Sequence, residues 1–250
     1  RFIFLRTRKT AGSSISAVLN RALGPRDIQV GGWSDARAAG GRVNLYAWSV
    51  IGRHPGLLSG ELWRELSLNR KLRLSSGAIN RIMKQDFRER YGFDGEHPRA
   101  VDARTVDPEA WGSHFKFCVV RNPWDHAVSD YHWRSKEQPG VTFFQFLEIL
   151  KDSEKADPHD VRPPLKSNWE VYTIDDEIQA DMILRYENLA SGLHEVGKKI
   201  GVQTDISSIF RKANFRPKAS LKQYYNEETT ELVREIYGKE IEAFGYKVPF

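Results

Sequence analysis

Residues 2–14, FIFLRTRKTAGSS, decide the fold of this chain. The apolar run Phe2–Leu5 predicts a short buried strand, and the basic, hydroxyl-rich residues after it predict a tight loop. Ile15, Val18 and Leu19 then recur at helical spacing. A strand, loop and helix in this order bring backbone N–H groups, hydroxyls and a lysine to a helix N-terminus. The segment therefore predicts a site for an anion, most often a phosphate.

The order of residues in this loop differs from that of the common nucleotide-binding loop. A Walker loop, GxxxxGK[ST], has its lysine after the glycines. Here Lys9 precedes Gly12, and two serines follow. The alternative is a strand–helix turn whose basic residues are solvated. A second anion-binding loop elsewhere in the chain is needed to favour the anion site over this alternative.

A second segment of the same kind follows later in the chain. The apolar run Phe115–Val120 predicts a strand, and it leads directly into Arg121, Asn122 and Pro123. Asparagine caps helices and proline suits their first position, so a helix is expected to begin here. Ligands of open α/β folds bind at the carboxyl ends of neighbouring parallel strands. The two loops therefore predict two anion subsites, the second formed by Arg121 and Ser129, which suits a nucleotide with phosphates at both ends.

The rest of the chain alternates between expected strands and expected helices. Further strands are expected at residues 44–51, 170–174 and 182–185. Helices are expected at residues 57–90, as a pair divided near residue 76, and at 142–150, 189–200 and 227–244. Residues 91–110 are expected to be mostly loop. This alternation predicts an α/β fold with a central, mostly parallel β-sheet flanked by helices.

The bulk properties limit the kind of protein. A chain of 250 residues can form one domain spanning residues 1–250. It has one cysteine, Cys118, no visible signal peptide and no apolar run of the ~20 residues that span a membrane, so we expect a cytoplasmic protein without a membrane span. The seven histidines are scattered and no Cys/His cluster has zinc spacing, so no metal is expected.

Positive charge is concentrated in one segment. The formal net charge is +5, and residues 64–90 contain eight basic and three acidic side chains. Such a segment attracts nucleic acid, an acidic polysaccharide or a membrane surface. The alternative is a solvated helical face.

Four motifs resemble those of one protein family, in the same order. Residues 9–14, KTAGSS, resemble the KTAGTS loop of the sulfotransferase superfamily that includes the carbohydrate sulfotransferases. Residues 120–125, VRNPWD, with Ser129, resemble its VRNPWDxxxS element. Residues 184–189, LRYENL, and 244–246, FGY, resemble its later RYENL stretch and its usual end. The resemblance spans nearly the whole chain and implies the P-loop-kinase-like fold of these sulfotransferases.

The resemblance implies a sulfuryl donor and the residues that bind it. The donor would be 3′-phosphoadenosine 5′-phosphosulfate (PAPS), the product 3′-phosphoadenosine 5′-phosphate (PAP), and no metal would be required. The first loop would hold the phosphosulfate, while Arg121 and Ser129 would hold the 3′-phosphate. The full set of expected donor-binding residues is Arg8, Lys9, Thr10, Ala11, Gly12, Ser13, Ser14, Arg121, Ser129, Arg185, Arg216 and Lys218. For Arg185, the alternative is a structural ion pair with Glu187.

The first loop departs from the family's pattern just before the lysine. The family's loop commonly reads HxPK, whereas residues 6–9 here read RTRK. Arg8 in place of proline makes the loop more positive and less rigid. We expect Arg8 to contact a phosphate or an anionic acceptor.

Catalysis is expected to need a cation and a base. Lys9 can follow the negative charge that builds on the leaving phosphate. For the base that takes the acceptor's proton, His97 is the first candidate, because related sulfotransferases often place a histidine in a GHxxA context and Ala100 fits it. Glu96 would orient the His97 ring or raise its pKa. His54, within the sequence GRHP, is the rival candidate.

The expected function is transfer of a sulfuryl group from PAPS to a hydroxyl of an acceptor, expected to be a carbohydrate and, from the basic charge, a polar or anionic glycan. Acceptor-side insertions are expected at residues 24–98 and 134–168. The alternatives are an atypical P-loop small-molecule kinase and a basic nucleic-acid-binding module. The position of Lys9 and the lack of an obvious Mg²⁺-binding acidic pair argue against the kinase. We expect no nucleic-acid partner.

Overall fold

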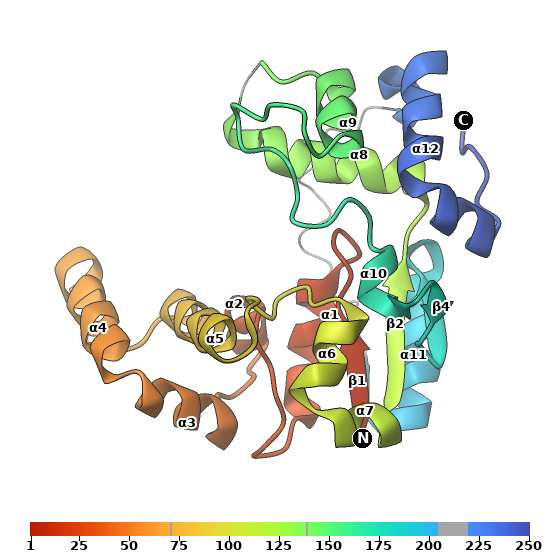
Figure 1. Ribbon diagram of the computed structural model, residues 1–250. Helices are drawn as coiled ribbons and strands as arrows, with labels where there is room; N and C mark the ends of the chain where they lie inside the picture. The colour runs from red at the N-terminus through yellow and green to blue at the C-terminus, as the bar shows by residue number, and fades with distance from the viewer. Residues whose placement is uncertain (71, 139, 205–219) are drawn as a thin grey trace.

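A three-stranded parallel sheet organises the computed structural model, which describes residues 1–70, 72–138, 140–204 and 220–250 (Figure 1). The strands lie in the order β1 (Phe2–Leu5), β2 (Phe115–Val120) and β5 (Met182–Arg185). Both pairings are parallel, with Leu5 opposite Cys118 and Val120 opposite Arg185. Parallel pairing brings the carboxyl ends of the strands to one edge of the sheet. The expected α/β class with a parallel sheet is confirmed.

Helices cover the sheet and also extend to one side of it (Figure 1). The α-helices in chain order are α1 (Gly12–Leu19), α2 (Trp33–Ala38), α3 (Leu45–Arg53), α4 (Pro55–Asn69), α5 (Ser76–Tyr91), α6 (Ala100–Val106), α7 (Pro108–Ser113), α8 (Pro123–Arg134), α9 (Phe143–Lys151), α10 (Trp169–Tyr172), α11 (Leu189–Ile200) and α12 (Glu227–Phe244). A short antiparallel pair consists of β3 (Thr173–Ile174) and β4 (Glu177–Ile178). None of the helices within the described ranges is long and apolar enough to cross a membrane.

Alternate residues of β2 face opposite sides of the sheet, and each side is covered by helices. Phe117 and Val119 pack on one side with residues of α1 and α11. Cys118 and Val120 pack on the other side with residues of α8, α9 and α12. All four side chains are buried. A strand covered on both faces in this way is a central strand of a doubly covered α/β sheet.

Local capping signals account for several helix starts. The side chain of Asn122 accepts the backbone N–H of Trp124 where α8 begins. Capping boxes open α9 at Thr142 and α12 at Asn226. Ser75 caps α5, so the expected helix pair within residues 57–90 is divided where the sequence predicts. These starts were predictable because each depends on residues within one turn.

Residues 44–51, expected to be a strand, form helix α3 instead. The Asn44 side chain accepts the backbone N–H of Ala47 at 3.1 Å and caps the helix. Ala47, Val50 and Ile51 are buried against the core that α3 forms with α2 and α5. Their spacing of three and four residues is helical, and it outweighs the strand preference of the valine, isoleucine and aromatic residues.

Two other expectations about secondary structure are wrong. Residues 170–174, expected to be a strand, lie mostly in helix α10, and only Thr173 and Ile174 pair as a strand. Residues 91–110, expected to be mostly loop, contain α6 and the first half of α7. Asp107 supplies the missed start signal of α7, because its side chain accepts the N–H of Ala110 at 2.9 Å.

Two parts of the basic segment, residues 64–69 and 76–90, lie in α4 and α5, to one side of the sheet (Figure 1). Several of its basic side chains form ion pairs with acidic residues, namely Arg81, Lys84, Arg88 and Arg90. Much of the positive charge is therefore balanced within the fold. This favours a solvated helical face over a surface for nucleic acid.

Candidate active site

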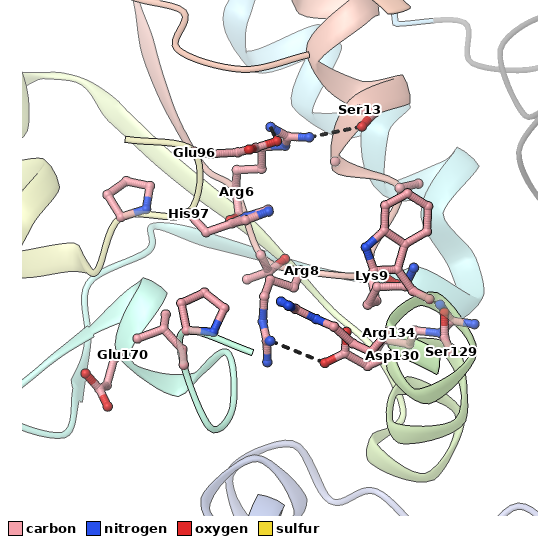
Figure 2. A pocket seen from close by; sticks show the side chains of 18 of the residues that line it. Arg6, Arg8, Lys9, Ser13, Glu96, His97, Ser129, Asp130, Arg134 and Glu170 are labelled. Atoms are coloured by element: carbon pink, nitrogen blue, oxygen red, sulfur yellow. Dashed lines mark hydrogen bonds and ion pairs between the residues drawn. The ribbon is translucent and has the colours of Figure 1, made fainter. Parts of the chain in front are cut away.

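A cavity of about 1290 Å³ lies where the loops after β1 and β2 meet. Its lining residues come from four stretches of the chain, residues 6–14, 93–102, 121–136 and 164–170, together with Tyr186. Figure 2 shows successive side chains of the first loop turning toward different walls of this cavity. The structure therefore brings the two expected anion loops to one site and adds two further stretches opposite them.

The first loop has a strained backbone. Lys9 and Ala11 both adopt left-handed conformations, with φ of 58° and 62°. Residues other than glycine rarely adopt this conformation, and it persists where the surroundings hold it. The Thr7 hydroxyl donates to the carbonyl of Val119 on β2 at 2.5 Å, and the Thr10 hydroxyl donates to the carbonyl of Thr7 at 3.1 Å. Thr10 is fully buried, so its side chain shapes the loop and does not line the cavity.

Helix α1 begins directly after this loop. Its N-cap is Ala11, and no side chain caps it, which leaves its first N–H groups suited to an anion. A β-carbon on Gly12 would lie 2.9 Å from the side chain of Arg6, so a larger residue here would require that side chain to move. Arg6 Nη2 donates to the Ser13 hydroxyl at 3.0 Å. Ala11, Gly12, Ser13 and Ser14 all line the cavity.

The ammonium group of Lys9 faces helix α8. Its Nζ lies 4.6 Å from the centre of the Trp133 ring. Burial lowers the pKa of Lys9 to about 8; the nearby Asp130 carboxylate opposes this, and the charge of Arg121 adds to it. At neutral pH the ammonium is therefore protonated but poorly compensated. An anion in the cavity would stabilise its charge.

Arg121 ties the second loop to the first. Its Nη1 donates to the carbonyl of Lys9 at 2.7 Å. Its Nε and Nη2 each lie 2.7 Å from one carboxylate oxygen of Asp125. The guanidinium also lies over the Tyr186 ring, 4.2 Å from its centre. Ser129, four residues beyond Asp125 on α8, lines the same cavity, so both residues expected to bind the 3′-phosphate lie at this site.

Arg8 lines the cavity and forms an ion pair at its wall. Its side chain is 4% exposed, and its Nη1 lies 3.2 Å from a carboxylate oxygen of Asp130, which is 1% exposed (Figure 2). The charge expected to meet a phosphate or an anionic acceptor is thus engaged by a buried carboxylate. Because Asp130 follows Ser129, this ion pair fastens the first loop to α8.

His97 is held by the backbone of the first loop. Its Nδ1 lies 2.8 Å from the Arg6 carbonyl, and since a carbonyl only accepts, Nδ1 carries the proton. Burial and, to a smaller extent, the charge of Arg6 lower the pKa of His97 to about 4. The ring is therefore neutral at pH 7, with Nε2 unprotonated, and it lines the cavity. Nε2 can accept a proton there.

Glu96 does not orient the His97 ring as expected. Its carboxylate binds Arg6 Nη1 at 3.2 Å and also pairs with Lys84. The orienting group is instead the Arg6 carbonyl. The charge of Glu96 does raise the pKa of His97, but the effect of burial is larger.

His54, the rival base, is absent from the lining of this cavity. Its Nε2 lies 3.0 Å from the buried carboxylate of Asp86, and its Nδ1 lies 3.7 Å from Glu89. It is also the residue between α3 and α4. These contacts give His54 a structural position and separate it from Lys9 and His97.

The remaining expected donor contacts lie elsewhere. Arg185 is not part of the cavity lining: its Nη2 donates to the Phe244 carbonyl at 2.5 Å, and its guanidinium lies over Tyr246. Glu187, its alternative partner, accepts the backbone N–H of Asn122 at 2.6 Å instead. Arg216 and Lys218 lie outside the described residues.

Sequence reasoning missed four residues that build this site: Arg6, Asp130, Trp133 and Asn168. Charge balance could have identified Arg6 and Asp130. Arg6 is one of three basic residues in the first loop, and such a loop needs buried carboxylates, of which Asp130 is one, to balance its charge. Trp133 is a further turn along the helix that carries Ser129. No signal in the sequence pointed to Asn168, because its partner, the backbone of Arg8, lies 160 residues away in the chain.

Metal ligands do not gather in the described part of the chain. Among those residues, no group of three or more histidine, cysteine, aspartate or glutamate side chains could hold a metal ion.

Comparison with known proteins identifies one family. The family model described as "Sulfotransferase family" matches residues 1–247, which confirms the resemblance seen in the motifs. A search of curated proteins and a search of solved structures each returned no match.

Replacing Arg8 by methionine should destabilise the fold. The substitution leaves the Asp130 carboxylate buried without its closest cation, which costs about 3 kcal/mol of unfolding free energy. Urea denaturation at pH 7 measures this loss. Arg234→Met is the matched control, because Arg234 forms an exposed pair with Glu231 and should change stability by less than about 1 kcal/mol. Equal effects of the two substitutions would contradict a structural role for Arg8.

Proposed function

Because the chain belongs to the sulfotransferase family, we propose that it transfers the sulfuryl group of PAPS to a hydroxyl group of an acceptor. The observation that carries this proposal is the convergence of Lys9, the N-terminus of α1 and a neutral His97 on one cavity. The cation and the N–H groups suit a phosphosulfate, and the imidazole suits removal of a hydroxyl proton.

The two loops fit a donor with an anion at each end. The uncapped start of α1 and the incompletely compensated Lys9 ammonium supply donors for the phosphosulfate. Arg121 and Ser129 supply donors for the 3′-phosphate. In our proposal Arg121 keeps its bonds to Asp125 and Lys9, which fix the direction of its guanidinium.

The residues of the site would assist an in-line displacement. The bound donor supplies the sulfuryl group: the acceptor oxygen forms a bond to sulfur while the bond from sulfur to the bridging oxygen breaks and PAP leaves. Lys9 stabilises negative charge on that bridging oxygen, which resembles the role of cations in phosphoryl transfer. His97 Nε2 takes the acceptor's hydroxyl proton, and the Arg6 carbonyl stabilises the imidazolium that results.

The acceptor is proposed to bind against the two stretches opposite the donor loops. Residues 93–102 and 164–170 line the cavity and lie at least partly within the expected insertions, 24–98 and 134–168, of a single domain. Arg134, Lys136 and Lys166 add positive charge to its lining. These cations support a polar or anionic glycan as acceptor.

The one cysteine, Cys118, is buried, which suits the proposed cytoplasmic location.

Calorimetry with nucleotides tests the donor class. PAP should bind about 10²-fold more tightly than ATP, because ATP has no 3′-phosphate for Arg121 and Ser129. Arg121→Ala should remove most of this preference, while Arg234→Ala, on the exposed face of α12, should not. Preferential binding of ATP with a magnesium requirement would favour the small-molecule kinase and sink the proposal.

PAP affinity should depend on pH through Lys9. With a pKa of about 8 in the free protein, Lys9 is charged below pH 8 and neutral above it. Affinity should therefore be flat from pH 7 to 8 and then fall by up to about tenfold per pH unit. Lys9→Arg should bind PAP without this decline up to pH 10, since arginine stays protonated. A decline of the same steepness in Lys9→Arg would show that another group titrates.

Two histidine substitutions test the base. His97→Ala should lower kcat by about 10²- to 10⁴-fold, because the acceptor proton loses its base. His54→Ala should leave kcat within about threefold at temperatures where the variant is folded, since His54 lies outside the cavity. In the unsubstituted protein, kcat should decline only as pH falls toward 4, where His97 becomes protonated. Loss of turnover in His54→Ala alone would assign the base to the other histidine.

A further inference from the structure

The strained conformation of Lys9 is fixed by the two peptide groups that flank it. A residue's φ and ψ follow from the orientation of the peptide planes before and after it. The plane after Lys9 is held by Arg121, whose Nη1 donates to the Lys9 carbonyl at 2.7 Å. The plane before Lys9 contains the Arg8 carbonyl, which accepts from Asn168 Nδ2 at 3.1 Å. Both planes must stay in place for φ of Lys9 to remain at 58°.

The amide of Asn168 binds the backbone of Arg8 at two points. Besides the bond to the Arg8 carbonyl, its Oδ1 accepts the Arg8 N–H at 2.8 Å. The side chain therefore pairs with Arg8 much as a neighbouring strand would. Asn168 is 6% exposed and is not among the residues that line the cavity. It can affect a ligand in the cavity only through the first loop.

The side chain of Asn168 does not cap a helix, although asparagine at a helix start usually does. Asn168 is the N-cap of α10, but its side chain forms no capping bond. The turn has a hydrogen bond of its own, because the Ser167 hydroxyl accepts the backbone N–H of Trp169 at 3.1 Å, and Glu240 of α12 lies beside it. Glu240 is itself buried. A rigid turn thus presents the amide of Asn168 to the first loop.

We propose that Asn168 is a positioning residue for sulfuryl transfer: its amide holds the peptide between Arg8 and Lys9 and so directs the Lys9 ammonium into the donor site. This inference rests on the proposed function of the cavity. Without the amide, the Arg8 carbonyl is free to rotate, and Lys9 relaxes toward a right-handed or extended conformation that relieves its strain. The ammonium then leaves the position that Trp133 and Asp130 define for it.

A double-substitution cycle with Lys9 measures this effect in turnover. Asn168→Ala should lower kcat by between about tenfold and 10²-fold, as misplacement of a reacting group does, and leave the KM for the acceptor nearly unchanged. In a Lys9→Ala background, Asn168→Ala should lower kcat by less than about threefold, because the group it positions is already gone. The same loss of kcat in both backgrounds would overturn the proposal, since Asn168 would then act independently of Lys9.

A second measurement needs no donor and separates this proposal from the proposed function. Acetylation of Lys9 by acetic anhydride, followed against pH by mass spectrometry, reports the pKa and exposure of its amine. In the unsubstituted protein the midpoint should lie near 8, and in Asn168→Ala it should move upward toward that of a solvated lysine. If this shift occurs but PAPS supports no turnover, the proposed function is wrong and the positioning role stands. An unchanged Lys9 profile in folded Asn168→Ala would refute the positioning role.

Two further variants keep the test decisive. Asn188→Ala is the matched control, since Asn188 is also a helix N-cap without a side-chain capping bond but is exposed, and it should change neither kcat nor the Lys9 profile. If Asn168→Ala does not fold, Asn168→Asp replaces it, because aspartate still accepts the Arg8 N–H but cannot donate to the Arg8 carbonyl. It should show the same loss of kcat and the same shift of the Lys9 profile.

Discussion

The site depends on one hydrogen bond, from Arg121 to the carbonyl of Lys9. This bond joins the loop after β1 to the loop after β2, at the edge where both parallel strands end. It places the Arg121 guanidinium near the Lys9 ammonium. The carboxylates of Asp125 and Asp130 balance the repulsion between these two cations. The carboxylates hold the arginines in place, while Lys9 keeps a lowered pKa and an incompletely compensated charge. A bound phosphosulfate would complete the balance.

The sequence predicted those parts of the fold that local signals determine. The strands at residues 2–5, 115–120 and 182–185 are short apolar runs followed by polar turns, and helices α8, α9 and α12 begin at capping residues. Residues 44–51 were misassigned because valine, isoleucine and aromatic residues favour strands, while burial of Ala47, Val50 and Ile51 against α5 selects a helix. Packing of this kind depends on elements distant in the sequence, which no local pattern reports.

The candidate site was predictable to the same degree. The loop around Lys9 and the pair Arg121 and Ser129 could be recognised as motifs, but Asn168, the partner of the Arg8 backbone, could not. His54 and His97 show the limit clearly: each is preceded by a glycine and one charged residue and followed by proline. Ala100 favoured His97 in the sequence, and the fold separates the two histidines by directing His54 to Asp86 and His97 to the Arg6 carbonyl beside the cavity. Arg216 and Lys218 stay predictions.

The arginine at position 8 also explains how this loop keeps its shape without the proline that the family commonly has there. Proline restricts φ through its ring and has no N–H to donate. Arg8 has a free φ, but its N–H and carbonyl are both bound by Asn168, and its side chain is bound by Asp130. Three non-covalent contacts thus replace one covalent ring. The exchange couples the loop to α10 and α8, so the rigidity that proline would supply locally now depends on residues more than a hundred positions away.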